Sequence, residues 1–415
     1  MENFNKYLGI YTTSGDVQTA INEGTLKKPY VALVDGVLDY NTISPEVDYS
    51  KMPLTFEITG DGDIVWEATD SSNAKTIEYS KNGGEWTSIT SDADTPPTIS
   101  VVSGDTLQFR GDNAAYSDGS GASSFNNTTT AQFRIKGNIM SLIDSTNFSG
   151  LTTLQSAFTF ALIFGCFEEP SGYRTVIDAS NLVLPATTLA DYCYASMFQG
   201  CTNLTTAPEL PATTLAQSCY QNMFGGCTSL TTAPELPATT LADNCYQGMF
   251  YGCTNLTTAP QLPATTLADS CYSDMFWGCT SLTQAPELPV TTLANNCYFN
   301  MFGGCTSLTT APELPATTLT SGCYLNMFSN CTSLTTAPSL PATTLAGDCY
   351  NQMFYGCSNL NYIKCLATDI SANGCTFGWV SGVASSGTFV KAASTDWSSK
   401  TGNNGIPTGW TVEEE

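Results

Sequence analysis

The feature that most constrains this chain is a 26-residue unit that recurs without interruption between Leu184 and Cys357. The first copy reads LPATTLADYCYASMFQGCTNLTTAPE, and later copies keep its prolines, its cysteine pair and its Met-Phe pair. A fixed period of this length is typical of a solenoid, in which each unit buries its apolar side only against its neighbours. The sequence therefore predicts seven stacked repeats, marked by Met197, Met223, Met249, Met275, Met301, Met327 and Met353.

Within each unit, the apolar positions predict a short helix. Six nearly constant residues fall at i, i+3, i+4, i+7, i+8 and i+11, which is one stripe of a helix, and we expect Gly200 to end it. Two Thr-Thr segments separated by prolines follow, and they are expected to form extended, parallel rows. The unit thus predicts a leucine-rich α/β solenoid. The six constant residues in the first copy are Ala190, Cys193, Tyr194, Met197, Phe198 and Cys201.

Composition limits the partners and the chemistry of the chain. The 415 residues carry a net charge of −24, and no Lys or Arg occurs between Leu184 and Cys357. Nucleic acid is therefore an unsuitable partner, because phosphate binding depends on Lys and Arg. The absence of His removes His-based nucleophile pairs, general bases and metal ligands. We expect no enzyme activity and no cofactor. No apolar run approaches membrane-spanning length and no secretion signal is visible, so membrane insertion is not expected.

The remaining sequence predicts further domains on both sides of the repeats. Residues 1–50 form a small anchor or assembly module, and residues 51–140 form an antiparallel β-sandwich. Residues 141–183 are a junction and N-terminal cap, in which Cys166 belongs to a degraded copy of the repeat motif. Residues 358–415 are the C-terminal cap with an acidic tail.

In the anchor module, Ser14 is expected to begin a short helix that runs to about Asn22. Asp35-Gly36 lies between two apolar runs and predicts a β-hairpin. The candidate anchoring residues are Tyr30, Val31, Leu33, Val37 and Leu38.

The sandwich module contains short alternating segments such as LTFEIT, TLQFRG and AQFRIKG, each bounded by turn residues. Asn82-Gly83-Gly84 predicts a hairpin loop. The polar segment 113–127 is expected to be a mobile loop. Asp61 and Asp63 are interpreted as turn residues, because the further ligands of a calcium loop are missing.

The repeat resembles the BspA-like leucine-rich repeat, in which Phe-x-x-Cys is followed by a leucine-containing strand. The matching residues are Phe198, Cys201 and Leu204, with their equivalents in each copy through Leu360. The unit departs from that family in its length, its Met before Phe and its double proline. The resemblance implies a binding protein of a family abundant in gut Bacteroidales and their phages.

The 17 cysteines all follow residue 165, and most occur as pairs eight residues apart. Disulfides and a zinc site are the alternatives to buried thiols; the odd count and the absence of Cys-x-x-Cys pairs favour thiols that pack as small apolar side chains. Recognition is instead expected on the variable side of the predicted helix, where aromatic residues could stack on sugars or anchor a protein. Free drift of an outer face is the alternative. The candidate ligand-binding residues are Tyr251, Trp277, Phe299 and Tyr355.

Residues 1–50 are similar to N-terminal segments of Bacteroides-phage fibre and head-decoration proteins. This resemblance implies a non-enzymatic virion structural protein, a head fibre or decoration protein of the receptor-binding type, that joins other virion proteins through residues 1–50. The repeats would then attach the phage particle to a host-surface glycan or protein, and a homotrimer is an assembly expected of such fibres. The alternative is a BspA-like adhesin on a bacterial cell surface.

Overall fold

The computed structural model describes residues 10–11, 32–34, 37–39, 47–125, 128–165, 175–393, 395–400 and 402–415. These residues belong to two compact units, Met1–Asp48 and Tyr49–Glu415, and each is described by itself. The helix predicted between Ser14 and Asn22 lies outside the described residues.

The first unit contains a three-stranded sheet. Strand β2 (Ala32–Val34) pairs in parallel with β1 (Ile10–Tyr11) and antiparallel with β3 (Val37–Asp39). In the antiparallel ladder Leu33 is the partner of Leu38, which confirms the hairpin predicted from the Asp-Gly pair between these strands.

Three of the five predicted anchoring residues therefore lie on β2 and β3. These are Leu33, Val37 and Leu38. Tyr30 and Val31 lie outside the described residues.

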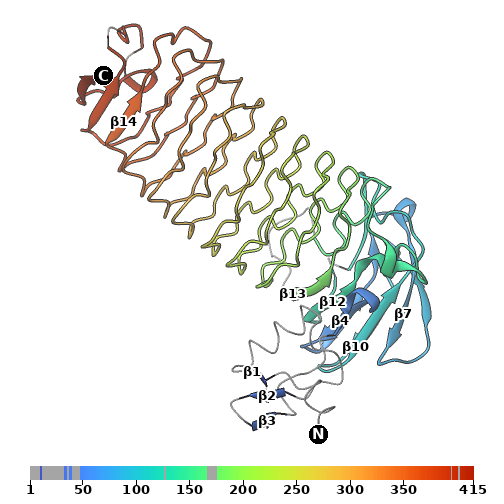
Figure 1. The fold of residues 1–415 in the computed structure, drawn as a ribbon. Helices are drawn as coiled ribbons and strands as arrows, with labels where there is room; N and C mark the ends of the chain where they lie inside the picture. The colour runs from blue at the N-terminus through green and yellow to red at the C-terminus, as the bar shows by residue number, and fades with distance from the viewer. Residues whose placement is uncertain are drawn as a thin grey trace. The chain divides into compact units, whose positions relative to one another are not determined.

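The second unit begins with a six-stranded sheet in the order β13-β12-β4-β10-β7-β8 (Figure 1). All neighbours are antiparallel except β12 and β13, which are parallel. Each strand that the sequence predicts in residues 51–140 is present. The strands of this sheet are β4 (Leu54–Ile58), β7 (Thr76–Lys81), β8 (Thr87–Thr90), β10 (Thr106–Arg110), β12 (Phe133–Asn138) and β13 (Val176–Val183).

The hairpin between β7 and β8 follows from its turn residues. Asn82 and Gly83 both have positive φ, +53° and +72°, and the Gly84 N–H donates to the Lys81 carbonyl at 3.0 Å. Positive φ at both central residues matches the twist of the flanking strands and favours an Asn-Gly pair. The predicted hairpin is confirmed.

Two short strand pairs form a further β layer. Strand β5 (Gly62–Val65) pairs with β9 (Thr98–Val101), and β6 (Glu67–Ala68) pairs with β11 (Ser123–Ser124). Short 3-10 helices connect the strands of the second unit. They are η1 (Tyr49–Lys51), η2 (Ser71–Asn73), η3 (Ile139–Leu142), η4 (Phe148–Gly150) and, near the C-terminus, η5 (Gly402–Asn404).

An aromatic cluster joins the two layers. The Phe125 ring lies 4.6 Å from the Trp66 ring and 5.0 Å from the Phe56 ring of β4, so it contacts both layers. Tyr116 is also fully buried, and its hydroxyl donates to the Leu142 carbonyl at 2.7 Å. The expectation of a mobile loop over residues 113–127 is therefore wrong for its described part, because two of its aromatic residues are core residues.

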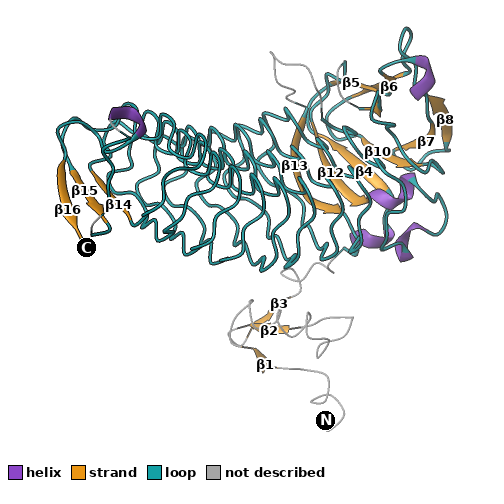
Figure 2. Cartoon of the chain, turned by 90° about the horizontal axis from the view of Figure 1, so that it is seen from above, coloured by secondary structure: helices purple, strands orange, loops and turns teal. Residues whose placement is uncertain are grey.

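Beyond β13 the 26-residue units lie side by side (Figure 2). In the first half of the unit the N–H groups alternate between two kinds of partner. Tyr194 donates to the Cys219 carbonyl of the next unit at 2.9 Å, whereas Cys193 donates to the Ala190 carbonyl of its own turn at 3.3 Å. Every second residue therefore joins neighbouring units.

The second half of the unit is extended but forms only isolated parallel bridges. Thr188 pairs with Thr214, and Thr240 pairs with Thr266. Prolines lie between the Thr segments and lack the N–H that a longer ladder would need, so the pairing stops after each bridge.

The predicted helix of the repeat is wrong. Tyr192, Ser196 and Gly200 have φ of +56°, +55° and +76°, so every fourth residue is left-handed and the chain runs as consecutive four-residue turns. An L-residue tolerates this conformation poorly inside a right-handed helix. The buried residues accordingly recur every four positions, and over twelve residues a period of four resembles a helical period of 3.6.

The core of the repeats consists of identical side chains stacked in columns. The Phe224 and Phe250 rings lie 5.7 Å apart, and the Tyr220 and Tyr246 rings lie 5.8 Å apart, with each pair nearly parallel. Both columns are almost completely buried. Each unit therefore buries its aromatic residues mainly against the two neighbouring units.

A three-stranded parallel sheet ends the chain: β14 (Tyr362–Cys365), β15 (Thr388–Lys391) and β16 (Thr411–Glu414). The Trp379 ring stacks on Tyr350 at 6.1 Å and on Trp397 at 5.8 Å, which covers the last Tyr of the column.

Main-chain contacts connect all of these parts of Tyr49–Glu415. The Ala179 N–H on β13 donates to the Thr206 carbonyl at 3.0 Å, and Thr336 bridges to Tyr362 of β14. Main-chain bonds therefore link the six-stranded sheet, the repeats and the C-terminal sheet, and one cluster of buried hydrophobic side chains extends through all three. We call residues 49–142 the sheet region and residues 184–357 the repeat region. The described part of Tyr49–Glu415 is thus strand-rich, with several sheets and a series of stacked repeats.

Candidate functional site

The outward side of the four-residue turns carries a column of residues that differ from one unit to the next. We call it the outer column. Main-chain bonds hold it in register: the Gly226 N–H donates to the Tyr251 carbonyl at 2.6 Å, and the Gly252 N–H donates to the Trp277 carbonyl at 2.7 Å. Its members are Gln199, Gly225, Tyr251, Trp277, Gly303, Ser329 and Tyr355.

Tyr251 and Trp277 form a stacked aromatic pair at the surface. Their ring centroids are 4.7 Å apart and their planes differ by 6°. This spacing is shorter than in the buried Phe column, yet the two residues remain 45% and 37% exposed. Large exposed aromatic side chains are unusual on a monomer surface and are favoured at binding sites.

Glycines at the two flanking positions of the outer column have different surroundings. A Cβ at Gly303 would lie 2.8 Å from Cδ1 of Trp277, so the indole extends over this glycine. The atoms nearest to a Cβ at Gly225 would be the Asn222 carbonyl oxygen at 3.4 Å and two side-chain carbons at 3.8 Å, from Asn222 and Gln199. A side chain at position 303 would therefore displace Trp277 or Asn300, whereas a Cβ at position 225, although the glycine is buried, would make ordinary van der Waals contacts.

The structure brings together two of the four predicted ligand-binding residues. Phe299 is half-buried and lies in a different column. Tyr355 is 44% exposed, but Gly303 and Ser329 separate it from Trp277 along the outer column. The predicted set therefore reduces to the pair Tyr251 and Trp277, with Tyr355 as a separate exposed ring.

The sequence reasoning missed the glycines. Gly225 and Gly303 lie on either side of the aromatic pair in the outer column, and both are buried. Phe377, the most exposed aromatic residue that the structure describes (58%), was also missed. Phe377 lies beyond the seven regular repeats, so the repeat pattern does not mark it as a variable outward position.

The charge around the aromatic pair is negative or absent. Asp274 lies three residues before Trp277, and its carboxylate accepts a hydrogen bond from Asn300 Nδ2 at 2.7 Å. Burial raises the pKa of Asp274 above its ordinary value, and the hydrogen bond from Asn300 opposes that shift. The glutamates that follow the Ala-Pro pair of several units are exposed to solvent. They are Glu209, Glu235, Glu287 and Glu313.

The 16 cysteines that the structure describes are buried and none forms a disulfide with another, while Cys166 lies outside the described residues. One cysteine column has a defined role. The Cys227 Sγ–H donates to the Phe198 carbonyl of the preceding unit at 3.1 Å, and Cys253 donates to Phe224 in the same way. The thiols therefore fill the core and join adjacent units, which removes them from consideration as a redox or metal site.

Burial controls the ionisation of these core groups. It raises the pKa of the Cys253 thiol to about 12, and it raises the pKa of Tyr220 well above the ordinary value. A thiolate is the reactive form of cysteine, so these thiols are unreactive in the folded protein.

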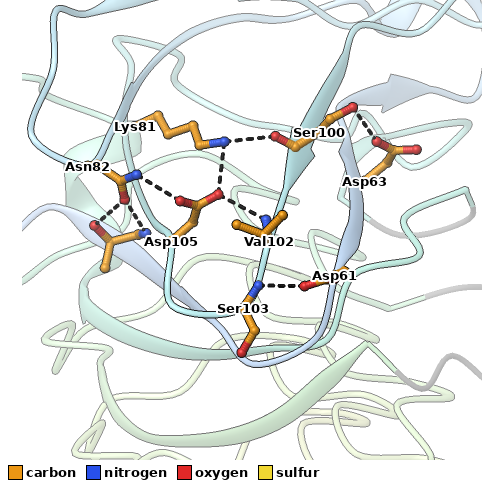
Figure 3. Close-up of polar contacts among 9 residues, drawn as sticks. Asp61, Asp63, Lys81, Asn82, Ser100, Val102, Ser103 and Asp105 are labelled. Atoms are coloured by element: carbon orange, nitrogen blue, oxygen red, sulfur yellow. Dashed lines mark hydrogen bonds and ion pairs between the residues drawn. The ribbon is translucent and has the colours of Figure 1, made fainter.

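The acidic turn of the sheet region is occupied by local hydrogen bonds (Figure 3). Asp61 accepts from the Ser103 N–H at 2.8 Å, and Asp63 accepts from the Ser100 hydroxyl at 2.7 Å. Nearby, hydrogen bonds from Asn82 and then Lys81 lower the pKa of Asp105 to about 2. This arrangement supports the interpretation of Asp61 and Asp63 as turn residues. No group of three or more Cys, Asp or Glu suited to a metal ion occurs among the described residues.

Within the same described part of the chain, no helix has the length and apolar character that crossing a bilayer requires.

Comparison with known families agrees with this geometry. A family model described as a BspA-type leucine-rich repeat region, in six copies, matches residues 178–301 and 269–377. The repeat region is a BspA-type leucine-rich repeat region. BspA-type repeats indicate an extracellular or surface protein of the adhesin-like kind. No curated protein and no solved structure is significantly similar to the chain.

Proposed function

We propose that this chain is a non-enzymatic attachment protein of the BspA-like adhesin kind. In this proposal its seven repeats close into a capped solenoid that holds the outer column toward a host or neighbouring cell. The observation that carries the proposal is the exposed Tyr251–Trp277 stack, because the BspA-type match alone gives no binding site.

The outer column is better suited to binding than the buried columns or the Thr rows. The buried columns hold nearly the same residues in every unit. Hydroxyls of the Thr rows donate to backbone carbonyls of the preceding unit, as Thr257 does to Thr231 at 3.2 Å and Thr309 to Thr283 at 3.3 Å. The outer column instead changes from unit to unit, from glycine to serine, glutamine, tyrosine and tryptophan.

The proposal is tested with the fluorescently labelled full chain on a panel of bacterial and epithelial cells. We expect saturable binding to at least one cell type. Tyr251→Ala combined with Trp277→Ala should weaken it about 30-fold, the loss expected when a hot-spot pair is truncated. Saturable binding to no cell type, or equal binding by the double variant, would contradict the proposal.

Residues 1–50 are proposed to attach the protein to its bearer. Leu33, Val37 and Leu38 lie in a three-stranded sheet that belongs to a compact unit separate from Tyr49–Glu415. Removal of residues 1–48 should release the protein from its bearer, while cell binding by the purified protein is kept. Retention of the shortened protein by its bearer would contradict an anchoring role.

A virion structural protein is the second candidate, and one observation favours it. The cysteines that the structure describes form no disulfides, and such thiols suit a protein that folds in the reducing cytoplasm where phage particles assemble. In this case residues 1–50 would bind other virion proteins, and a homotrimer would present the repeats. Gold-labelled antibodies against the chain would bind phage particles in the second case and the bacterial surface in the first.

A further inference from the structure

Two adjacent units carry the aromatic pair together with most of the aspartates of the repeat region. The region contains five aspartates, and three of them lie in the units of Tyr251 and Trp277. The three are Asp243, Asp269 and Asp274, and the other two are Asp191 and Asp348. No Lys or Arg occurs in the region, so none of its own side chains can neutralise these carboxylates.

The turn that carries Trp277 places Asp274 beside it. The Trp277 N–H donates to the Asp274 carbonyl at 3.0 Å, and such a bond between residues i and i+3 keeps their Cα atoms within about 7 Å. The Asn300 side chain lies between the two: its Nδ2 donates to Asp274 Oδ1 at 2.7 Å. Its Oδ1 and Trp277 Cδ1 are 2.2 Å and 2.8 Å from the position that a Cβ on Gly303 would take.

Asp274 keeps one carboxylate oxygen for a ligand. The residue is half-buried, and its Oδ1 accepts the bond from Asn300. Its Oδ2 accepts no hydrogen bond from the described residues. Burial raises the pKa of Asp274, because the charged carboxylate is partly removed from water, and a positive charge nearby would stabilise that charged form.

Asp243 and Asp269 extend the negative charge on the same side of the units. Both are exposed, and they lie eight residues before Tyr251 and Trp277, which is two four-residue turns along the chain. Main-chain bonds fix both carboxylates: Asp243 accepts from the Asp269 N–H at 3.1 Å, and Asp269 accepts from the Asn295 N–H at 2.9 Å. The exposed rings are therefore accompanied by three carboxylates in fixed positions.

This combination favours a cationic side chain as the ligand. Lys and Arg have an apolar stem, which can pack on the exposed rings, and a charged head, which donates to carboxylates. Arg fits better than Lys, because its planar guanidinium also packs on aromatic rings and can donate to two oxygens at once. An anionic ligand would be repelled, since the region offers it no counter-charge. The rings remain 45% and 37% exposed, so a partner can contact them at the surface and no enclosed cavity is needed.

We propose that the Tyr251–Trp277 pair binds a basic protein segment on the target cell, with Asp243, Asp269 and Asp274 as the partners of its Arg and Lys side chains. The rings contact the stems of these side chains, and the carboxylates pair with their heads. This inference rests on the proposed attachment function and specifies its partner.

The test measures binding of the full chain to three fluorescent peptides of equal length by fluorescence anisotropy. The peptides alternate Gly with Arg, with Lys, or with citrulline, which is the neutral analogue of arginine. Asp269→Asn and Asp274→Asn each remove one charge of the site, and Tyr251→Ala combined with Trp277→Ala removes the rings. Circular dichroism establishes that each variant is folded.

The repeats offer a matched control for each charge variant. Asp191→Asn matches Asp269→Asn, because Asp191 is exposed at the same position of its unit and also accepts an N–H from the next unit, at 3.1 Å. Asp348→Asn matches Asp274→Asn, because Asp348 has φ of +54° and also accepts from an Asn amide, at 2.9 Å. Each control has the same net charge as the variant that it matches, so general attraction of a basic peptide to an acidic chain affects both equally.

We expect the Arg and Lys peptides to bind, the Arg peptide more tightly, and the citrulline peptide not to bind. Asp269→Asn and Asp274→Asn should each weaken binding about two- to fivefold, and loss of both rings should weaken it about tenfold or more. Asp191→Asn and Asp348→Asn should leave it unchanged. Equal binding of the citrulline peptide, no binding of the Arg and Lys peptides, equal weakening by the controls, or no effect of the ring variant would overturn the proposal.

A parallel assay on the cell panel separates this inference from the attachment function. If wild-type binding to cells is unaffected by Asp269→Asn and Asp274→Asn, or is abolished by periodate treatment of the cells but not by trypsin, the attachment function stands and the basic partner fails. If the wild-type chain binds no cells, the attachment function itself fails.

Discussion

The sheet region and the repeat region share one hydrophobic core, but different interactions hold their surfaces together. The sheet region has ion pairs, among them Lys81 with Asp105 at 2.8 Å and Arg110 with Glu78 at 2.7 Å. The repeat region has no cationic side chain with which to form one. Its units are joined instead by main-chain bonds, stacked rings and thiols that donate to carbonyls. We therefore expect the stability of the first region to respond to pH through carboxylates and that of the second region through buried neutral thiols and tyrosines.

The largest expected effect is that high pH destabilises the repeat region more than the sheet region. Buried thiols such as Cys253, with a pKa of about 12, and buried Tyr such as Tyr220 must be neutral in the folded repeats. In the unfolded chain a thiol ionises near 9, so the stabilisation from its raised pKa is complete below pH 9 and is lost as the pH rises toward 12. We expect cooperative loss of the repeat region in this range, measured by tyrosinate absorbance at 295 nm together with circular dichroism. Tyrosinate that appears gradually at pH 12 with an intact circular dichroism spectrum would contradict this assignment.

Truncation of one stacked ring should have the next largest effect. Phe250→Ala removes a ring that lies 5.7 Å from both Phe224 and Phe276, and should lower the free energy of unfolding by about 3–5 kcal/mol. Hydrogen exchange should rise mainly in the adjacent units, because each unit contacts only its neighbours. The control is Tyr251→Ala, the adjacent exposed residue, which should change stability by under about 1 kcal/mol. Exchange that rises equally in the sheet region would show that the two regions unfold together.

A smaller loss of stability is expected when a glycine with positive φ in the repeat region is replaced. Gly252 has φ of +67°, and Gly252→Val places a β-branched residue in the left-handed region, which should cost about 2 kcal/mol. Gly225→Ala is the matched control, since a Cβ there meets only ordinary van der Waals contacts. Urea denaturation of both variants tests the prediction. Equal stability of the two variants would mean that the four-residue turns can reorganise.

The smallest expected effect is the acid response of the sheet region. Hydrogen bonds from Asn82 and Lys81 hold the pKa of Asp105 at about 2, so this carboxylate stabilises the fold above its ordinary pKa near 3.8 and loses that effect as the pH falls to 2. Asp105→Asn should reduce the change in urea midpoint between pH 5 and pH 2. Asp94→Asn, at an exposed carboxylate of the same region, should leave this change as in the wild type.

The sequence was sufficient to predict the elements that depend on local patterns. The strands of the sheet region follow from alternation, and the Asn82-Gly83 turn follows from the positive φ that these residues accept. The buried thiols follow from an odd count of cysteines at constant positions. Each of these predictions used only information about residues adjacent in the sequence, or about a position that is the same in every repeat.

The backbone of the repeat could not be predicted by the same reasoning. The stripe from Ala190 to Cys201 is compatible with both a helix and four-residue turns, because the two periods separate only over a longer segment. The deciding signal is the identity of the residues at every fourth outward position, where Asn, Asp, Gly and Ser recur because they tolerate left-handed φ. Asp274 is one of them, at φ of +56°, so its place in the chain follows from backbone conformation and not from catalysis.

The site was predictable only in part. The aromatic character of Tyr251 and Trp277 could be read from the sequence, but their stacking required the register between neighbouring units. The separation of Phe299 and Tyr355 from the pair depends on the direction in which each side chain leaves its turn. Sequence spacing does not determine that direction when the turns are not helical.

The main-chain bonds that recur between neighbouring units have a consequence for how such a protein can evolve. In the four-residue turns, neighbouring units meet through the same main-chain bonds, as from Tyr194 to Cys219 and from Tyr220 to Cys245. Recombination between nearly identical 26-residue gene segments could therefore lengthen or shorten the protein by one unit without altering either end. Each event would change the length of the repeat region by one unit. It would also duplicate or delete one residue of the outer column, so that the length and the exposed residues would change together.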